Sequence, residues 1–459
     1  MLERLRNQER ARLPRAMAET GHTVEISLAE WERVGPAEVP ALHGLTLDAT
    51  AAAQAKALGN KLSVRPGFGG VEVEAVSHVG YVAIGPLRIA VQPKLPALPL
   101  TRLLRYAYGL RDLGPPLDQT AAPLAVHGLH DILVALLAAE AEELLHRGLA
   151  RQYVTRNEWL ENPRGRIMVG DLVRRGGVLE ARLPCRHTER RTDWRLNQVL
   201  RAGLRLAEEV AGDPELRRRV QRLHAMMDGV AAVSLDGSAL DVTERSLTRL
   251  TAAYAPALTL VRLLLDAQGI AVEPGRTAEV PGFLFDMNSF FQRLVSRFLH
   301  DNLPSDQHIQ DERSVHGLLA YAPATNPQNR LAPRVRPDYA LVEGKAPQRF
   351  LDAKYRDVWN RNCPPEWLYQ LSLYALASPG RVSVLLYGTT DEAALEERVE
   401  IRPPATGGRP VAATVVFRPV LLPRLAELVG AEGNNSRKAE RRWLAARLVA
   451  VQGLAGAAC

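Results

Sequence analysis

The N-terminal part of the chain, up to about residue 120, alternates apolar and polar positions over short segments. The alternating segments are Val24–Leu28, Leu62–Val64, Val71–Val76 and Tyr81–Val91. A period of two predicts β-strands. The last segment, within GYVAIGPLRIAVQPKL, has the pattern of a half-buried antiparallel hairpin that ends at Pro93. Residues 1–120 are therefore expected to form a small β-rich module.

From about residue 125 to residue 275 the apolar spacing changes to that of helices. Leucine and valine recur at intervals of three and four residues in the runs Ile132–Leu145, Leu196–Leu204 and Leu247–Leu265. Turns rich in proline, glycine and arginine, such as Asn162–Arg166, join these runs. The pattern predicts a helical middle region over residues 121–278.

Beyond about residue 280 the expected order is helix, three strands, helix and strand. The predicted elements are a helix at 287–300, strands near 307–310, 336–342 and 348–355, a helix at about 365–377 and a strand at Val382–Tyr387. The fold class is therefore expected to be α/β, in a mixed α+β arrangement. Residues 279–400 would form a domain with a central mixed sheet flanked by helices, and residues 401–459 a C-terminal extension.

Composition and charge narrow the class of protein. The 46% apolar and 24% charged content is typical of a globular chain, and 459 residues favour two or three domains. The net charge is +7, and arginine is far more frequent than lysine. Arginine binds phosphate in a bidentate manner, so this balance favours a nucleic-acid partner, although a high-GC genome would enrich arginine in the same way.

The cysteines and the hydropathy pattern indicate a cytoplasmic protein without membrane association. Cys185, Cys363 and Cys459 are odd in number and widely spaced, which fits neither a disulfide framework nor a CxxC metal site. The N-terminus is charged and lacks the apolar core of a signal peptide. The longest aliphatic stretch, around Ile132–Ala139, falls short of the roughly 20 residues that a membrane span needs.

Three charged residues stand on two neighbouring predicted strands, RVRPDYALV and QRFLDAKYR. Asp338 opens the first strand directly after Pro337, while Asp352 and Lys354 are two positions apart on the second and share one face. Pairing of the strands can bring all three together. Paired carboxylates suit Mg²⁺ or Mn²⁺, which activates water and stabilises charge on a phosphate, and the lysine can position that water. The pattern indicates metal-assisted phosphodiester hydrolysis.

A simpler interpretation is a surface ion pair between Asp352 and Lys354, with Asp338 in an unrelated turn. The apolar residues around them favour buried strands instead. The next predicted helix carries Gln370 and Tyr374 at positions i and i+4, which places both on one face. Alone, this pair is an ordinary half-exposed helix face, but with the strands it supports a nuclease site.

The P-D…(D/E)-x-K strands followed by Q-x-x-x-Y resemble the PD-(D/E)xK nuclease superfamily, which includes RecB-like and restriction nucleases. More narrowly, the chain resembles the McrC family, the nuclease subunits of McrBC modification-dependent restriction systems. The resemblance covers most of the chain through the order of GYVAIGPLRIAVQPKL, CRHTERRTDWRLNQVL, FLFDMNSFFQRLV, RPDYAL, LDAKYR and YQLSLYALAS. It implies a restriction-endonuclease-like C-terminal domain that cleaves DNA.

The resemblance also carries residue roles. It implies metal binding by Asp338 and Asp352, catalysis by Lys354, and contacts to the site or the nucleic-acid backbone by Gln370 and Tyr374. Gln292 stands where family members commonly have glutamate. An amide is no anionic ligand, so metal binding is expected to be weaker, or a water to replace that contact.

Finally, the resemblance implies an AAA+ GTPase partner of the McrB type, docked to the N-terminal module, and modified DNA as substrate. The chain contains no G-x-x-x-x-G-K-[ST], and Gly344-Lys345-Ala346 lacks the upstream glycine and the hydroxyl residue. No nucleotide is therefore expected to bind this chain. Three alternatives stay open: a stand-alone RecB-like repair nuclease, a nuclease acting on RNA, and a scaffold or GTPase activator with a decayed site.

Overall fold

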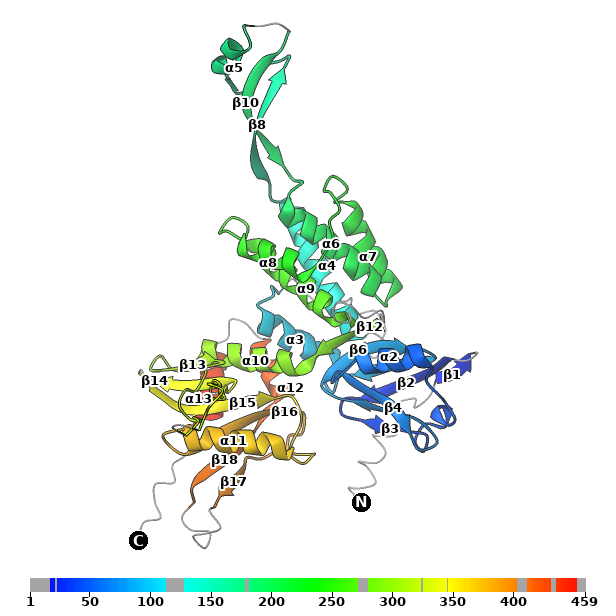
Figure 1. Cartoon of the computed structure of the whole chain (residues 1–459), viewed down its shortest axis with the longest axis vertical. Coiled ribbons are helices and arrows are strands. Elements are labelled where there is room, and N and C mark those ends of the chain that lie inside the picture. The colour runs from blue at the N-terminus through cyan, green and yellow to red at the C-terminus, as the bar shows by residue number, and fades with distance from the viewer. Residues whose placement is uncertain are drawn as a thin grey trace. The chain divides into compact units, whose positions relative to one another are not determined.

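The chain divides into two compact units, whose elements are labelled in Figure 1. The first unit contains Met1–Asp112, Pro123–Leu129 and Gly269–Cys459, and the second contains Leu113–Ala122 and His130–Gln268. The computed structural model describes residues 17–20, 23–112, 128–177, 181–270, 280–322, 325–344, 346–402, 411–430 and 435–451. Cys459 and Lys345 lie outside the described residues.

Two sheets form the N-terminal module of the first unit. The larger has the order β1 (Met17–Thr20), β2 (Thr23–Ala29), β7 (Leu87–Gln92), β6 (His78–Ile84), β12 (Val280–Asp286) and β11 (Gln268–Ile270). The smaller has the order β3 (Arg33–Val34), β5 (Gly70–Ala75) and β4 (Leu62–Gly67). The predicted hairpin is confirmed, because β6 and β7 pair antiparallel with Val82 opposite Ile89. Buried side chains alternate along these strands and form one apolar core.

Helices also belong to this module, which the alternation did not predict. They are η1 (Pro40–Leu42) and α2 (Ala49–Ala57); a third helix, α3 (Ala97–Tyr108), follows in the sequence but packs against the helix at Met287–Asn302. The alanine-rich α2 begins where the Asp48 side chain accepts a hydrogen bond from the backbone of Ala51. α3 ends at Gly109, whose φ of 66° is the left-handed conformation that glycine adopts without strain. Both helices are short and interrupt the alternating segments, so the β-type pattern around them dominates the sequence.

The second sheet of the first unit carries the C-terminal part of the chain. Its order is β13 (Gln307–Asp311), β14 (Tyr339–Glu343), β15 (Ala346–Lys354), β16 (Val382–Thr389), β18 (Ala413–Leu421) and β17 (Glu397–Ile401). Its helices are α10 (Met287–Asn302), α11 (Pro365–Ala377), α12 (Leu422–Val429) and α13 (Asn435–Val449). β15, β16 and β18 are parallel and the other pairs antiparallel, so the predicted mixed sheet flanked by helices is confirmed.

Two predicted boundaries fall inside these sheets. β17 and β18 continue the C-terminal sheet beyond residue 400, so part of the predicted extension belongs to that sheet. β12, at the start of the predicted 279–400 domain, pairs with β6 of the N-terminal module. Sequence pattern predicts neither of these two pairings, because tertiary packing determines which strand pairs with which. Changes in local composition mark only the ends of segments along the chain.

Helices α10 and α11 lie on opposite sides of β15 (Figure 1). Phe350 packs against Tyr374 of α11, with 6.5 Å between the ring centroids. Tyr339 pairs with Leu351, the next residue on β15, and its hydroxyl donates to the backbone carbonyl of Gln292 on α10. Because successive strand residues point to opposite faces, one helix covers each face of the sheet.

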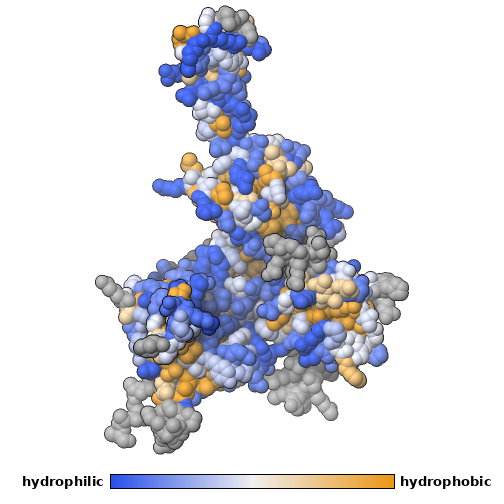
Figure 2. Space-filling view, in the orientation of Figure 1, coloured by the Kyte–Doolittle hydropathy of each residue, from blue (hydrophilic) through white to orange (hydrophobic). Residues whose placement is uncertain are grey.

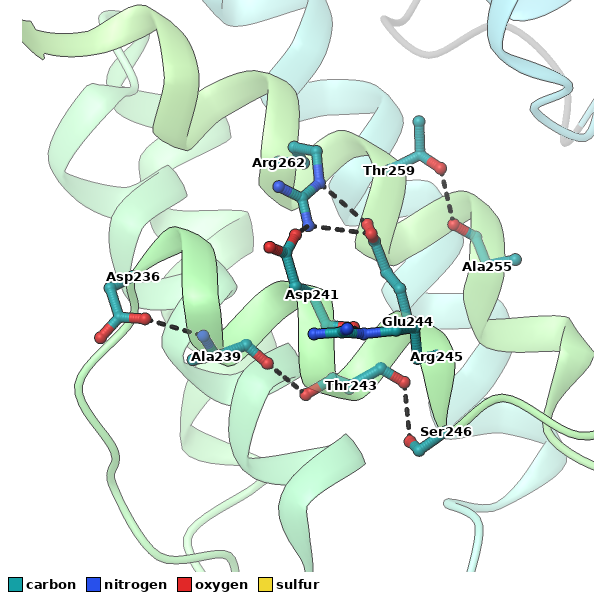
Figure 3. A network of polar contacts seen from close by, with 10 residues as sticks. All are labelled: Asp236, Ala239, Asp241, Thr243, Glu244, Arg245, Ser246, Ala255, Thr259 and Arg262. Atoms are coloured by element: carbon teal, nitrogen blue, oxygen red, sulfur yellow. Dashed lines mark hydrogen bonds and ion pairs between the residues drawn. The ribbon is translucent and has the colours of Figure 1, made fainter.

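The second unit contains the predicted helices. They are α4 (Leu129–Arg147), α6 (Arg195–Val210), α7 (Pro214–Ala225), α8 (Gly237–Arg245), η3 (Ala252–Tyr254) and α9 (Ala255–Ala267). α6 and α9 approach closely at Gly203, where a Cβ would lie 2.2 Å from Val261. Arg262 of α9 forms ion pairs with Asp241 and Glu244 of α8, as Figure 3 shows. Polar and apolar contacts thus both join this helical bundle.

A small sheet interrupts the helices of the second unit, and the prediction of a helical middle region did not include it. It has the order β8 (Gln152–Leu160), β10 (Leu183–Arg191) and β9 (Arg166–Ile167), with α5 (Val169–Arg174) beside it. Most of its residues are exposed, and Figure 2 shows a largely hydrophilic surface there. Strands without a buried face carry little apolar alternation, which explains the miss. Among the described residues, no helix has both the length and the apolarity to cross a membrane.

Candidate active site

Asp338 and Asp352 meet in the C-terminal sheet, where β14 begins. Asp338 immediately precedes β14, and its backbone carbonyl accepts a hydrogen bond from the backbone N–H of Glu312 over 2.8 Å. In the antiparallel register of β14 and β15, Tyr339 lies opposite Leu351, so Asp338 comes level with Asp352. The structure thus brings the two acids together, although fourteen positions separate them in the sequence.

Lys354 joins the two carboxylates. Its Nζ lies 2.8 Å from Oδ2 of Asp352 and 3.8 Å from Oδ2 of Asp338. The backbone N–H of Ala353 also donates to Oδ2 of Asp338 over 2.8 Å. Asp352 is only 2% exposed, so this is a buried cluster and not the surface ion pair of the simpler interpretation.

Burial and mutual repulsion shape the charges of the cluster. Burial raises the pKa of Asp338 to about 7, and the neighbouring Asp352 contributes to the rise. Burial lowers the pKa of Lys354, but the carboxylates of Asp352 and Asp338 outweigh it and hold that pKa above its ordinary value. Two acids thus share one firmly protonated lysine, an arrangement that favours a further cation.

Gln292 reaches the cluster from α10. Its Nε2 donates to Oδ2 of Asp338 over 3.0 Å and lies 3.5 Å from the carbonyl oxygen of Ala353. Helix α10 therefore does face the acids, as the resemblance to the McrC family implied. Gln292 contributes a hydrogen-bond donor there and no third negative charge.

Gln370 and Tyr374 lie behind the site on α11. The Gln370 amide donates to the Tyr374 hydroxyl over 2.5 Å, and that hydroxyl donates to the backbone carbonyl of Arg336 over 3.0 Å. Arg336 stands two residues before Asp338. Tyr374 is buried, and burial together with the charge of Asp352 raises the pKa of its hydroxyl. In this position the pair supports the segment that presents Asp338.

The N-terminal module supplies residues beside the site that the sequence did not reveal. Lys94 Nζ donates to the backbone carbonyls of Tyr355 and Gly388 over 2.7 and 2.8 Å. The Tyr355 hydroxyl donates to Glu30 over 3.0 Å, and its backbone N–H donates to Asn288 over 3.1 Å. The end of β15 is thus held from two sides. A lone lysine after a strand gives no sign of a partner 261 residues away.

The donor set fits a divalent cation of the Mg²⁺ type. Oδ1 of Asp352 is buried and has no hydrogen-bond partner in the described part of the chain, so a carboxylate oxygen is left to be satisfied. Within those same residues no group of three or more His, Cys, Asp or Glu side chains is arranged around a metal position. Mg²⁺ needs only one or two carboxylates because it retains waters and binds substrate phosphates. Asp338 and Asp352 are the residues that could hold it.

Fold and site together define a mixed α/β protein that presents an acid–acid–lysine cluster on a central sheet. The family model described as McrBC 5-methylcytosine restriction system component matches residues 73–388. The chain belongs to this family, and it is a component of a restriction system. No curated protein matches it.

A solved structure supports the fold. The chain is similar to one in the refined half-complex from the tetradecameric assembly of Thermococcus gammatolerans McrB AAA+ hexamers with bound McrC. The similarity covers 92% of this chain and 99% of that one, at 22% identity and a TM-score of 0.60. A chain of the cryo-EM structure of the Thermococcus gammatolerans McrBC complex matches over 61% of this chain and 88% of its own length, at 19% identity and a TM-score of 0.45.

Proposed function

We propose that this chain is the DNA-cleaving subunit of a McrBC-type restriction system and that it hydrolyses phosphodiester bonds with a divalent cation. The observation that carries the proposal is the buried cluster of Asp338, Asp352 and Lys354, with one carboxylate oxygen of Asp352 unsatisfied. Family membership supports a restriction subunit over a stand-alone RecB-like nuclease, and a restriction component favours DNA over RNA as the substrate.

Each side chain of the cluster has a role in the proposed reaction. Mg²⁺ or Mn²⁺ held by Asp338 and Asp352 would supply an activated water and a counter-charge for the phosphate. Lys354 presents three N–H donors and stays protonated, so it would orient the attacking water or stabilise developing negative charge. Gln292 and the Ala353 N–H would hold the Asp338 carboxylate in one orientation.

The proposed partner is an AAA+ GTPase of the McrB type. The Thermococcus gammatolerans assembly contains McrB AAA+ hexamers with bound McrC, and the present chain has no phosphate-binding loop of its own. We propose that such a partner hydrolyses GTP and delivers modified DNA, while this chain binds no nucleotide. A cytoplasmic location, suggested by the cysteines, belongs to the same proposal.

Chelation tests the proposed function most simply. Treating the full chain and its AAA+ GTPase with EDTA, followed by dialysis, should remove cleavage of a modified plasmid. Mg²⁺ or Mn²⁺ should then restore it, because no side chain of the cluster can replace the metal in activating water. Gel electrophoresis of the plasmid gives the readout. Undiminished cleavage in EDTA would rule out a metal-dependent nuclease.

Gln292→Glu provides a sharper test of the metal site. Glutamate at this position would place a third carboxylate beside Asp338, where the amide now donates over 3.0 Å. We expect the variant to bind Mn²⁺ on the order of ten-fold more tightly, the scale associated with residues around a metal. Cleavage should be kept or increased. Calorimetric titration of both proteins measures the difference.

The matched control is Gln310→Glu, which adds the same charge on β13. Affinities that are equal for wild type and Gln292→Glu would mean that α10 does not reach the metal.

The presence of Gln292 also supports a second candidate function, a scaffold that activates the GTPase without cutting DNA. In that case Mn²⁺ would bind neither protein and metal addition would never produce cleavage.

A further inference from the structure

Cations and indole rings alternate beside the candidate site. Lys354 Nζ lies 5.8 Å from the ring centroid of Trp367, and the guanidinium of Arg356 lies 6.0 Å from the same ring. Arg356 also lies 5.1 Å from the ring centroid of Trp31, a residue of the N-terminal module. The guanidinium therefore lies near the rings of two indoles, and it stands two residues beyond the lysine of the cluster.

No acid forms an ion pair with the two arginines described at this place. Neither Arg356 nor Arg361 takes part in an ion pair within the described residues, unlike Arg219 and Arg418. Burial lowers the pKa of Arg356, and the like charge of Arg361 lowers it further, against weaker opposing effects of Cys363 and Glu74. A local excess of positive charge beside the two acids is suited to binding an anionic substrate that also extends to the acids.

The backbone that carries Trp31 is strained. Trp31 has a φ of 62° in a turn closed by the hydrogen bond from Glu32 N–H to the carbonyl of Ala29. Such a position in a turn favours glycine or asparagine. The carbonyl of Trp31 accepts a hydrogen bond from Arg361 over 2.5 Å, which holds the turn against the loop that follows β15. Strain of this kind persists where the surroundings fix it, and it concentrates at functional sites.

From this geometry we propose that Arg356, which lies near the rings of Trp31 and Trp367, binds the DNA phosphate next to the one that is cleaved. A stacked guanidinium keeps its in-plane N–H groups available, and these match two phosphate oxygens. Trp31 thereby makes the N-terminal module part of the substrate site as well as a candidate docking surface. The inference rests on the proposed DNA-cleaving function, because it takes the cleaved phosphate to lie at Lys354.

The test measures binding of the full chain to a fluorescein-labelled DNA duplex by anisotropy, without divalent metal, over a series of salt concentrations. Arg356→Gln should weaken binding roughly ten-fold at low salt, the scale of a hydrogen bond to a charged group. It should also reduce the slope of log K against log salt by about 1, the effect of one lost phosphate contact. Arg356→Lys should retain the slope, because the charge remains, but should bind less tightly.

Arg442→Gln removes the same charge from an exposed position on α13 and is the matched control. Trp31→Gly removes the ring while relieving the strained φ, so it should weaken binding without lowering the melting temperature below that of Arg356→Gln. When cleavage with the partner is measured over a range of DNA concentrations, Arg356→Gln should raise KM and leave kcat nearly unchanged. If Arg356→Gln and Arg442→Gln have the same slope and affinity, the inference is wrong. Equal DNA binding by Arg356→Gln and Arg442→Gln would say nothing about cleavage, which the Asp352 variants test. Failure of this inference is therefore distinguishable from failure of the proposed function.

Discussion

Asp352→Asn is expected to lower the rate of DNA cleavage on the order of 10³-fold or more, the scale for removing a preorganised charge from an active site. The substitution keeps the size of the side chain but removes the negative charge that lies 2.8 Å from Lys354. It also replaces the unsatisfied oxygen that is available to a metal. Both the cleavage rate and the affinity for Mn²⁺ should therefore fall, as single-turnover assays and calorimetry will measure.

The variant Lys354→Gln distinguishes metal binding by the two acids from catalysis by the lysine. Without the lysine, the two acids lose the cation that they share, so Mn²⁺ should bind at least as tightly while cleavage is still lost. Asp306→Asn and Lys438→Gln change exposed residues in the same ways and serve as controls. Circular dichroism and thermal melting establish that the variants fold. Full activity of Lys354→Gln would remove the lysine from the catalytic group.

The second large effect concerns the partner. The purified chain should neither bind nor hydrolyse GTP, and it should cleave DNA slowly, since only salt-sensitive backbone contacts hold the substrate. Adding the AAA+ GTPase with GTP should raise cleavage by about 10²–10⁴-fold, the usual gain when a second module holds the same ligand. The comparison needs plasmid cleavage with GTP and with a non-hydrolysable analogue. Equally rapid cutting by the isolated chain would contradict a partner-dependent system.

Deletion of residues 1–120 would disturb the candidate active site as well as the proposed docking surface for the partner, so it cannot test docking alone. β12 pairs with β6 of the N-terminal module, and Lys94 and Glu30 hold Tyr355 next to Lys354. Such a deletion would expose the edge of β12 and leave the end of β15 unsupported. Substitutions on the exposed surface of the module test docking without this loss.

Sequence pattern predicts much of the C-terminal sheet because the central strands carry buried apolar runs bounded by clear breaks. β16 is buried along its whole length, and β14 and β15 carry compact apolar runs that frame the acids. The side-chain period of two also predicts that Asp352 and Lys354 share a face. Antiparallel pairing with β14 then accounts for the position of Asp338.

Other features depend on contacts that no local pattern encodes. The exposed strands β8 and β10 bury little, so no apolar alternation marks them. The approach of Trp31 to Arg356 joins segments more than three hundred residues apart, and so does the hydrogen bond between Tyr355 and Glu30. Only the resemblance to a family predicts Gln292 near the acids, because helix periodicity alone does not fix which sheet residue a helix meets.

The most direct test of whether this chain contains the active site compares two reconstituted complexes, one with the wild-type chain and one with Asp352→Asn. GTP hydrolysis and cleavage of modified DNA are followed in the same Mg²⁺-containing reaction. We expect equal GTP hydrolysis in both complexes and cleavage by the wild-type complex alone. Cleavage at the wild-type rate by the Asp352→Asn complex would show that the DNA is cut elsewhere and would contradict the assignment of the active site to this chain.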